Sequence, residues 1–151
     1  MTMISKQKPY RGPAMEGALA AWYARMTGAD RTRFVDAARA LAARVPRGGR
    51  VLELASGPGY LAIEVARRGY RVTGVDVSRS FVAIARANAA GAAVDFVHGD
   101  AAHLPFADAS FDHVVCMAAF DSFSDPVGVL AEIHRVLVPG ASASIFELRR
   151  R

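Results

Sequence analysis

One stretch decides the fold class of this chain: Val51-Leu52-Glu53-Leu54-Ala55-Ser56-Gly57-Pro58-Gly59-Tyr60-Leu61-Ala62. A short apolar run leads into a glycine-rich turn, and the turn leads into residues with helical spacing. Gly57, Gly59 and Ala62 satisfy the pattern G-x-G-x-x-[GA], which is typical of the first strand–helix turn of a nucleotide-binding α/β fold. Gly57 permits a tight turn, and Gly59 lets the backbone approach a ligand closely. The pattern alone is a weak signal, because many strand–helix turns need glycine for structural reasons.

The chain beyond this turn alternates between short apolar runs and helical patterns. We expect strands at 50–54, 71–76, 94–98, 111–117 and 142–148, and helices near 60–68, 80–90 and 126–137. Apolar strands that alternate with helices indicate a parallel sheet covered on both faces, with right-handed crossovers. The predicted fold is therefore α/β: a doubly wound, Rossmann-like parallel sheet of five strands in the order 3-2-1-4-5, with helices on both faces.

Two further helices are predicted before the sheet. Apolar residues recur at helical spacing at Leu19, Trp22, Tyr23 and Met26, and Gly28 follows as a C-cap. A second helix is expected to begin after Asp30 as its N-cap and to run to about Arg44. We divide the single structural domain into an N-terminal arm with helices, 1–49, and a ligand-binding core, 50–151.

The composition is that of one globular domain. The chain has 151 residues, of which 52% are hydrophobic and 22% charged, enough for a core without disulfides or metals. The single cysteine, Cys116, cannot form an internal disulfide, and the N-terminus does not resemble a signal peptide. No apolar run reaches the roughly 18 residues that span a bilayer. We expect a cytoplasmic protein that makes no membrane contact.

The net charge of +5 is not by itself evidence for a nucleic-acid partner. The arginines are spread along the predicted helices, as on solvated helix faces. The four histidines are scattered and lack the spacing of metal ligands, so no metal site is predicted.

Two acids point to a nucleoside ligand. Asp76 ends the second strand, 19 residues after Gly57, where a carboxylate can accept hydrogen bonds from both ribose hydroxyls. Its alternative role is to cap the following helix, for which Ser78 is better placed. Asp100 follows Gly99 after the third strand, at the same edge of the sheet, where it can accept a hydrogen bond from an adenine amine.

A third acid, Glu53, separates two classes of nucleoside cofactor. An acid near the end of an apolar central strand is costly unless it meets donors. Dinucleotide-binding loops offer backbone N–H groups to a pyrophosphate and have no need of such an acid. A cofactor with a cationic amino-acid end does explain it. The chain also lacks a second nucleotide-binding half and a Tyr-x-x-x-Lys pair, so an NAD-dependent oxidoreductase remains only a minor alternative.

Five segments, in order, resemble the motifs of class I S-adenosylmethionine-dependent methyltransferases: 53–59, 72–78, 99–106, 110–115 and 132–140. The resemblance covers about residues 50 to 148 and implies S-adenosylmethionine as the cofactor and a small molecule as the methyl acceptor. Asp76 would bind the ribose hydroxyls, Asp100 and the Ala101 backbone would frame the adenine, and Glu53 would act near the methionine end. The implied cofactor-binding residues are Glu53, Ala55, Gly57, Gly59, Asp76, Val77, Gly99, Asp100, Ala101 and Cys116.

The chain departs from the family pattern in two places. Ala55 stands where the family usually has its first glycine, so a positive φ there would be strained. The family's usual sheet has seven strands and ends in an antiparallel hairpin, whereas the motifs here stop at the fifth. We therefore expect a truncated C-terminus, a fifth strand that is an exposed edge, and a homo-oligomer formed through that edge. The alternative function is a non-catalytic cofactor-binding module that acts through self-association or a partner.

The methyl acceptor leaves few traces in the sequence. Candidate substrate contacts are Tyr10, Trp22, Tyr23 and Phe120; the first three could form a lid, or Trp22 and Tyr23 could simply pack their helix. No catalytic residue is assigned, because His113 lies within a strand, where a structural role is favoured. Cys116 lacks the following proline of cytosine-5 methyltransferases, and 117–120 lacks the Asp/Asn-Pro-Pro-aromatic signature of amino methylation. A nucleic-acid substrate is therefore not expected.

Overall fold

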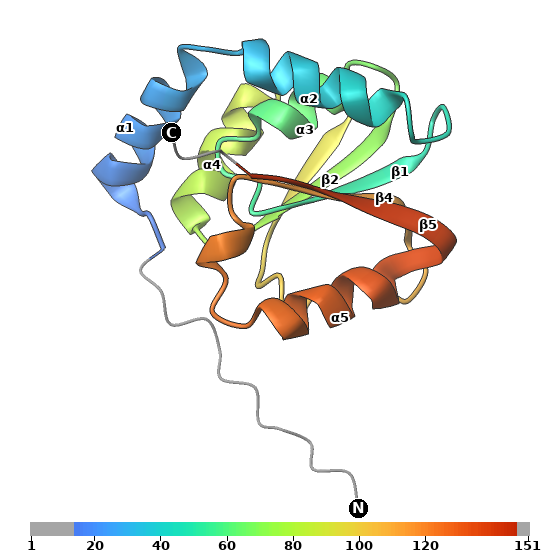
Figure 1. The fold of residues 1–151 in the computed structure, drawn as a ribbon. Helices are drawn as coiled ribbons and strands as arrows, with labels where there is room; N and C mark the ends of the chain where they lie inside the picture. Colours follow the sequence, from blue (N-terminus) through green and yellow to red (C-terminus); the bar gives the residue numbers. More distant parts are fainter. Residues whose placement is uncertain (1–13, 148–151) are drawn as a thin grey trace, which may run out of the picture.

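The computed structural model describes residues 14–147 (Figure 1). The elements are α1 (Gly17–Gly28), α2 (Thr32–Ala42), β1 (Arg50–Leu54), α3 (Tyr60–Ala66), β2 (Arg71–Asp76), α4 (Arg79–Asn88), β3 (Val94–His98), β4 (Phe111–Met117), the 3-10 turn η1 (Phe120–Ser122), α5 (Pro126–Val136) and β5 (Leu137–Phe146). The five strands form one parallel sheet in the order β3-β2-β1-β4-β5. The predicted fold class and strand order are confirmed.

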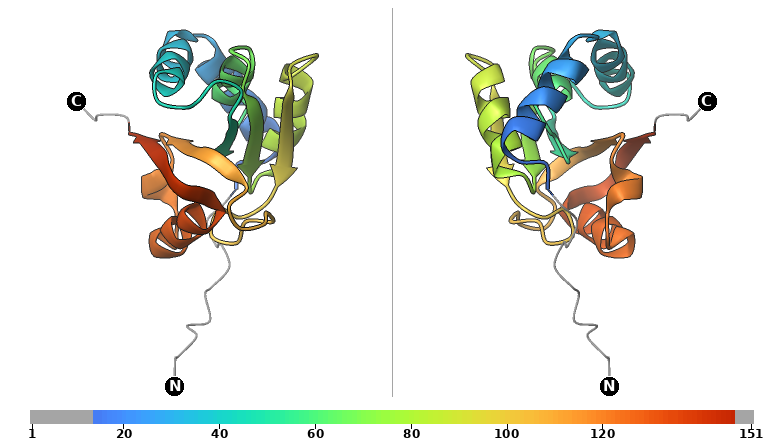
Figure 2. Two further views of the ribbon diagram at one scale, coloured as in Figure 1. Left: turned by 90° about the vertical axis from the view of Figure 1, so that its right-hand side faces the viewer. Right: turned by 90° about the vertical axis from the view of Figure 1, so that its left-hand side faces the viewer.

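The sheet separates two hydrophobic layers. Figures 1 and 2 show α1 to α4 on one side of the sheet and α5 on the other. Side chains alternate along β1, so Val51 joins the core cluster under α2 and α3, whereas Leu52 joins the cluster under α5. Leu41 of α2 lies fully buried in the first cluster. Both faces of the central strands are thus covered, which explains why these strands read as continuous apolar runs.

The boundaries of β1 to β4 coincide with the predicted ranges, but β5 does not. It begins at Leu137, directly after α5, instead of at Ser142. The pairing with β4 shifts register, because Phe111 lies opposite Leu137 and His113 lies opposite Ser142. Pro139 and Gly140, which lie between the predicted helix and the predicted strand, are therefore part of β5. Leu148, the predicted end of the strand, lies outside the described residues.

The C-cap role predicted for Gly28 is wrong. Gly28 is the last residue of α1, and the C-cap is Ala29, in a right-handed conformation. Glycine is required there by packing, since a Cβ at Gly28 would lie 2.5 Å from the Tyr60 Oη. That hydroxyl donates to the Ala24 carbonyl (2.6 Å) and ties α3 to α1. The N-cap role predicted for Asp30 is also wrong, because the N-cap of α2 is Arg31, although the Asp30 carboxylate accepts from the Thr32 N–H (3.0 Å).

The buried face of α1 is also not the predicted one. Leu19, Trp22 and Met26 are 54%, 51% and 60% exposed, while Ala20 and Ala24 are buried. The alternative in which Trp22 packs its helix into the core is therefore wrong. The buried residues of α1 are thus small ones, on a helix that packs against α4.

The start of α1 is fastened to the start of α4. The Glu16 carboxylate accepts from the backbone N–H groups of Arg79 (3.0 Å) and Ser80 (2.9 Å), and the Gly17 N–H donates to the Ser80 hydroxyl (2.9 Å). These donors are the free N–H groups of the first turn of α4, which a carboxylate satisfies well. α1 is thereby held beside the carboxyl end of β2.

Candidate functional site

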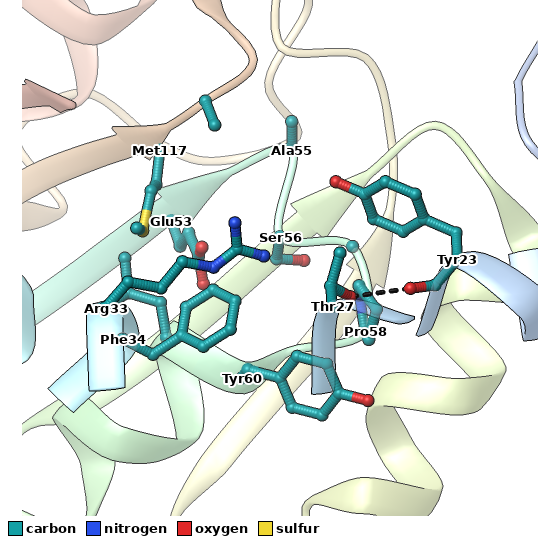
Figure 3. A pocket seen from close by; sticks show the side chains of 13 residues that line it. Tyr23, Thr27, Arg33, Phe34, Glu53, Ala55, Ser56, Pro58, Tyr60 and Met117 are labelled. Atoms are coloured by element: carbon teal, nitrogen blue, oxygen red, sulfur yellow. Dashed lines mark hydrogen bonds between the residues drawn. The ribbon is translucent and has the colours of Figure 1, made fainter. Parts of the chain in front are cut away.

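Two of the cavities in the described part of the chain lie side by side at the carboxyl ends of β1, β2 and β4. The two cavities adjoin, because they share five lining residues, Tyr23, Ala55, Gly57, Met117 and Ala118, and we call the pair the hollow. We call the part that reaches Glu53 the inner cavity and the part that reaches Asp76 the outer cavity. Figure 3 shows the side chains around the inner cavity. This edge is where ligands bind in open α/β sheets.

Glu53 is a buried acid at the base of the inner cavity. It lies within β1 and is 4% exposed, and its carboxylate accepts from the Ala62 N–H (3.0 Å) at the first turn of α3. Burial raises the pKa of Glu53 well above its usual range, and the nearby Asp76 carboxylate raises it further. A cationic ligand group in the inner cavity would offset that cost.

Asp76 organises the glycine-rich loop. Its two carboxylate oxygens accept from the Gly57 N–H and from the Ser78 N–H, each at 2.8 Å. Burial raises the pKa of Asp76, and these two hydrogen bonds oppose the rise. The Ser78 hydroxyl accepts from the Phe81 N–H (3.0 Å) and is the cap of α4. Capping therefore belongs to Ser78, while Asp76 faces the outer cavity with Val77 beside it.

The loop between β1 and α3 has a left-handed backbone at three positions. Gly57 and Gly59 have φ of 51° and 84°, and Ala55 has φ of 51°. The strain expected at Ala55, if φ there were positive, is therefore present. Gly59 is also required by packing, because a Cβ there would lie 2.5 Å from the Phe96 ring. Gly57 has open space at its Cβ position, so its glycine serves the backbone conformation alone.

The Gly99–Asp100–Ala101 segment lies at the carboxyl end of β3 but lines neither cavity. Asp100 accepts from the Ala102 N–H (2.9 Å) and closes a tight turn. Ala101 is buried in the cluster under α5. The side chain of Asp100 remains partly exposed, so it is available to a ligand that extends past Val77.

Cys116 is also absent from the lining of both cavities. It is 1% exposed in the cluster under α5, and burial raises the pKa of its thiol to about 12. The alternation of β4 turns Cys116 away from the hollow and turns Met117 toward it. Met117 and Ala118, not Cys116, form the floor.

Of the candidate substrate residues, some line the cavities and others do not. Tyr23 lines both cavities, whereas Trp22 lines neither. Phe120 packs against the cluster under α5, with its ring 5.8 Å from that of Phe123, and it is Phe123 that reaches the outer cavity. Tyr10 lies outside the described residues.

Several lining residues of the inner cavity were not predicted as site residues, among them Arg33, Phe34 and Tyr60. Tyr60 follows the glycine motif directly, so its position in the motif was a usable signal. Arg33 and Phe34 lie on α2, remote in sequence from every motif, and only the tertiary fold brings them to the loop.

Two other kinds of site are not seen in residues 14–147. No helix there is long and apolar enough to cross a membrane. No group of three or more His, Cys, Asp or Glu side chains is gathered there as a metal site would require.

Comparison with known proteins identifies the family of this chain. A family model described as a methyltransferase domain matches residues 52–145. The chain is 42% identical, over 80% of its length, to a demethylmenaquinone methyltransferase from Deinococcus radiodurans, of which it covers 51%. It spans about half the length, or less, of the curated relatives that it matches.

Solved structures also resemble this chain. The chain superposes with a TM-score of 0.71 on a chain from the complex between the Haloferax volcanii Trm112 methyltransferase activator and a proposed methyltransferase; the two are 37% identical, over 83% of this chain and 56% of that one. It also resembles the [4+2]-cyclase SpnF, with a TM-score of 0.67 and 34% identity over 74% of this chain and 44% of that one. Because the family model covers well over half of the chain, this protein belongs to the methyltransferase domain family.

Proposed function

We propose that this chain is the S-adenosylmethionine-binding core of a methyltransferase that acts on a small molecule. The observation that carries the proposal is the pair of buried carboxylates, Glu53 and Asp76, at the two ends of one hollow, with the Gly57 loop between them. A ligand with a cationic amino-acid end and a ribose matches both. The names of the curated relatives, which include quinone methyltransferases, support a small-molecule acceptor.

The sizes of the cavities support an assignment of the two ends. The outer cavity measures ≈290 Å³ and the inner one ≈100 Å³, so the nucleoside belongs beside Asp76 and the amino-acid end beside Glu53. In this arrangement Asp76 accepts from the ribose hydroxyls, and Asp100 with the Ala101 backbone borders the adenine. When bound, the cofactor supplies a methyl group on a cationic sulfur. The chain contributes positioning and electrostatics, which suffice for a direct transfer.

In this proposal residues 50–151 form the cofactor-binding core, and the helices within 1–49 close it. Tyr23 is the substrate-side contact that we retain, since it lines both cavities. Cys116 is a buried free thiol, which is compatible with the cytoplasmic location that belongs to the same proposal.

Calorimetric titration with S-adenosylhomocysteine, the demethylated product, tests cofactor binding. We expect binding by the wild type and at least tenfold weaker binding by Asp76→Ala, equivalent to about 1.4 kcal/mol. The control is Asp112→Ala, which removes an ion pair with Arg50 at the start of β4, away from both cavities, and should leave binding as in the wild type. Binding of NAD without binding of S-adenosylhomocysteine would show that the proposal is wrong.

A second candidate function is cofactor binding without methyl transfer. The likeness to the [4+2]-cyclase SpnF favours it, because a chain 34% identical to this one is named for a different reaction. A screen for released S-adenosylhomocysteine over a panel of small phenols, quinones and amines separates the two. Product release with any acceptor supports the enzyme, and tight binding with no turnover supports the second candidate.

A further inference from the structure

The inner cavity contains a second charged side chain, Arg33, that none of the motifs explains. Arg33 extends from the first turn of α2, and Figure 3 shows its guanidinium group projecting into the cavity above the β1–α3 loop. Glu53 and Ser56 line the same cavity. A cation and a buried acid therefore border one small space.

The two charges do not neutralise each other. The Arg33 Nε is buried and has no hydrogen-bond partner among the described residues, where buried polar atoms are otherwise nearly always paired. Arg33 takes part in none of the ion pairs found within residues 14–147. Glu53 has its bond to the Ala62 N–H and no cationic partner. Leaving two such groups unmatched costs free energy that a ligand with complementary charges restores.

Arg33 packs against a pair of aromatic rings. Its guanidinium carbon lies 4.7 Å from the centre of the Phe34 ring, and that ring lies 5.4 Å from the Tyr60 ring. Tyr60 is buried and anchored through its hydroxyl to the Ala24 carbonyl. A guanidinium that is oriented in advance loses less entropy when it binds a carboxylate in its planar fork.

We propose that Arg33 and Glu53 together form a receptor for a zwitterionic α-amino-acid group, with Arg33 binding the carboxylate and Glu53 the ammonium. The inference rests on the proposed function and deepens it, because the methionine end of the cofactor carries this pair of charges. A carboxylate on the methyl acceptor has the same chemistry, but the position of Glu53 at the base of the same cavity favours the cofactor.

Two ligands that differ only in the carboxylate test the proposal. S-adenosylhomocysteine has both charges, and its decarboxylated analogue, S-adenosyl-3-thiopropylamine, keeps the ammonium alone. Calorimetry should show that Arg33→Met weakens S-adenosylhomocysteine at least tenfold and leaves the analogue within twofold. Glu53→Gln should weaken both ligands. Arg33→Lys, which keeps the charge without the planar fork, should lose an intermediate amount of affinity for S-adenosylhomocysteine. This variant keeps the test valid if Arg33→Met does not fold.

Arg31→Met is the matched control. Arg31 lies on the same turn, with its guanidinium carbon 4.6 Å from the centre of the Tyr60 ring, but it does not line the cavity. The Arg31→Met variant should bind both ligands with the affinity of the wild type. Equal loss of both ligands in Arg33→Met, or unchanged affinity for S-adenosylhomocysteine, overturns the inference. If the wild type binds neither ligand, it is the proposed function that fails.

Discussion

Ala55 and Ala118 follow the adjacent strands β1 and β4, and both have left-handed backbones, with φ of 51° and 56°. Both also line the inner and the outer cavity. Residues with a side chain seldom adopt this conformation, and such strain gathers at functional sites, where the surrounding structure enforces it. The strain thus coincides with the floor of the candidate site.

We expect Ala55→Gly and Ala118→Gly each to raise the free energy of unfolding by about 0.5–1 kcal/mol. The left-handed conformation destabilises a folded protein with alanine at this position by roughly 1–2 kcal/mol. Glycine relieves this strain, but its greater freedom in the unfolded chain lowers the free energy of unfolding by about 0.5–1 kcal/mol. Urea unfolding measures the change. Ala109→Gly is the control: Ala109 has φ of 51° but lines neither cavity, so the same gain in stability is expected there from the backbone conformation alone. Gly57→Ala should show the opposite sign, and a loss of stability in Ala55→Gly would contradict the argument.

Glu53→Gln should stabilise the free protein at neutral pH by about 1 kcal/mol while weakening binding of S-adenosylhomocysteine. The neutral amide keeps an oxygen for the Ala62 N–H and removes a charge that burial disfavours. Thermal unfolding and calorimetry measure the two effects. Asp36→Asn on α2 is the control, since Asp36 makes only an exposed ion pair, with Arg39, and should change stability by less than about 0.5 kcal/mol.

The stability gain of Glu53→Gln should depend on pH. The pKa of Glu53 is raised in the folded state. The contribution of this side chain to the wild-type free energy of unfolding is therefore complete below the pKa of the unfolded state, about 4.3, and is lost as the pH rises through the pKa of the folded state. The difference between the two proteins should therefore grow from pH 4 upward. A difference that is constant between pH 4 and 8 would show that Glu53 is ionised without penalty.

The sequence predicted the sheet well because its signals are local. The second strand ends at Asp76, the third ends just before Gly99, and the first runs into the Ser56–Gly57 turn, so these ends were visible. Once the strand order was inferred, Glu53 and Asp76 had to meet at one edge. The fold and the placement of these acids thus followed from pattern and topology alone.

The remaining features depend on contacts between distant segments. Gly28 looked like a helix terminator, yet its reason is the Tyr60 hydroxyl, 32 positions along the chain. Cys116 and Met117 are neighbours whose sides of the sheet are set by the pairing of β4. Arg33 was one arginine among many on a helix. No periodicity could show which of them turns inward.

Arg135→Met should destabilise the protein by about 2 kcal/mol. From α5, Arg135 donates to the carbonyls of Leu104 (3.1 Å) and Phe106 (2.7 Å), and it also pairs with Glu132 and Asp108. Hydrogen bonds from a charged donor contribute about 1.5–3 kcal/mol, and this side chain is partly exposed. Chemical unfolding measures the loss. Arg39→Met, which breaks only an exposed pair with Asp36, should cost under about 0.5 kcal/mol.

The edge of the described sheet at β5 should mediate self-association, and Ile145→Lys should abolish it. β5 pairs only with β4 in the described residues, and Ile145 on it is 42% exposed. An unprotected edge pairs readily with a second copy, and a lysine placed on it opposes that pairing. Light scattering at 1–100 µM, on the order of usual working concentrations, should show a mass above the monomer for the wild type and a monomer for the variant. Leu130→Lys is the control, because Leu130 is an apolar residue of similar exposure on α5 and not on the edge, so this variant should still associate. A wild type that stays monomeric throughout, or an Ile145→Lys variant that still associates, would exclude the edge as the interface.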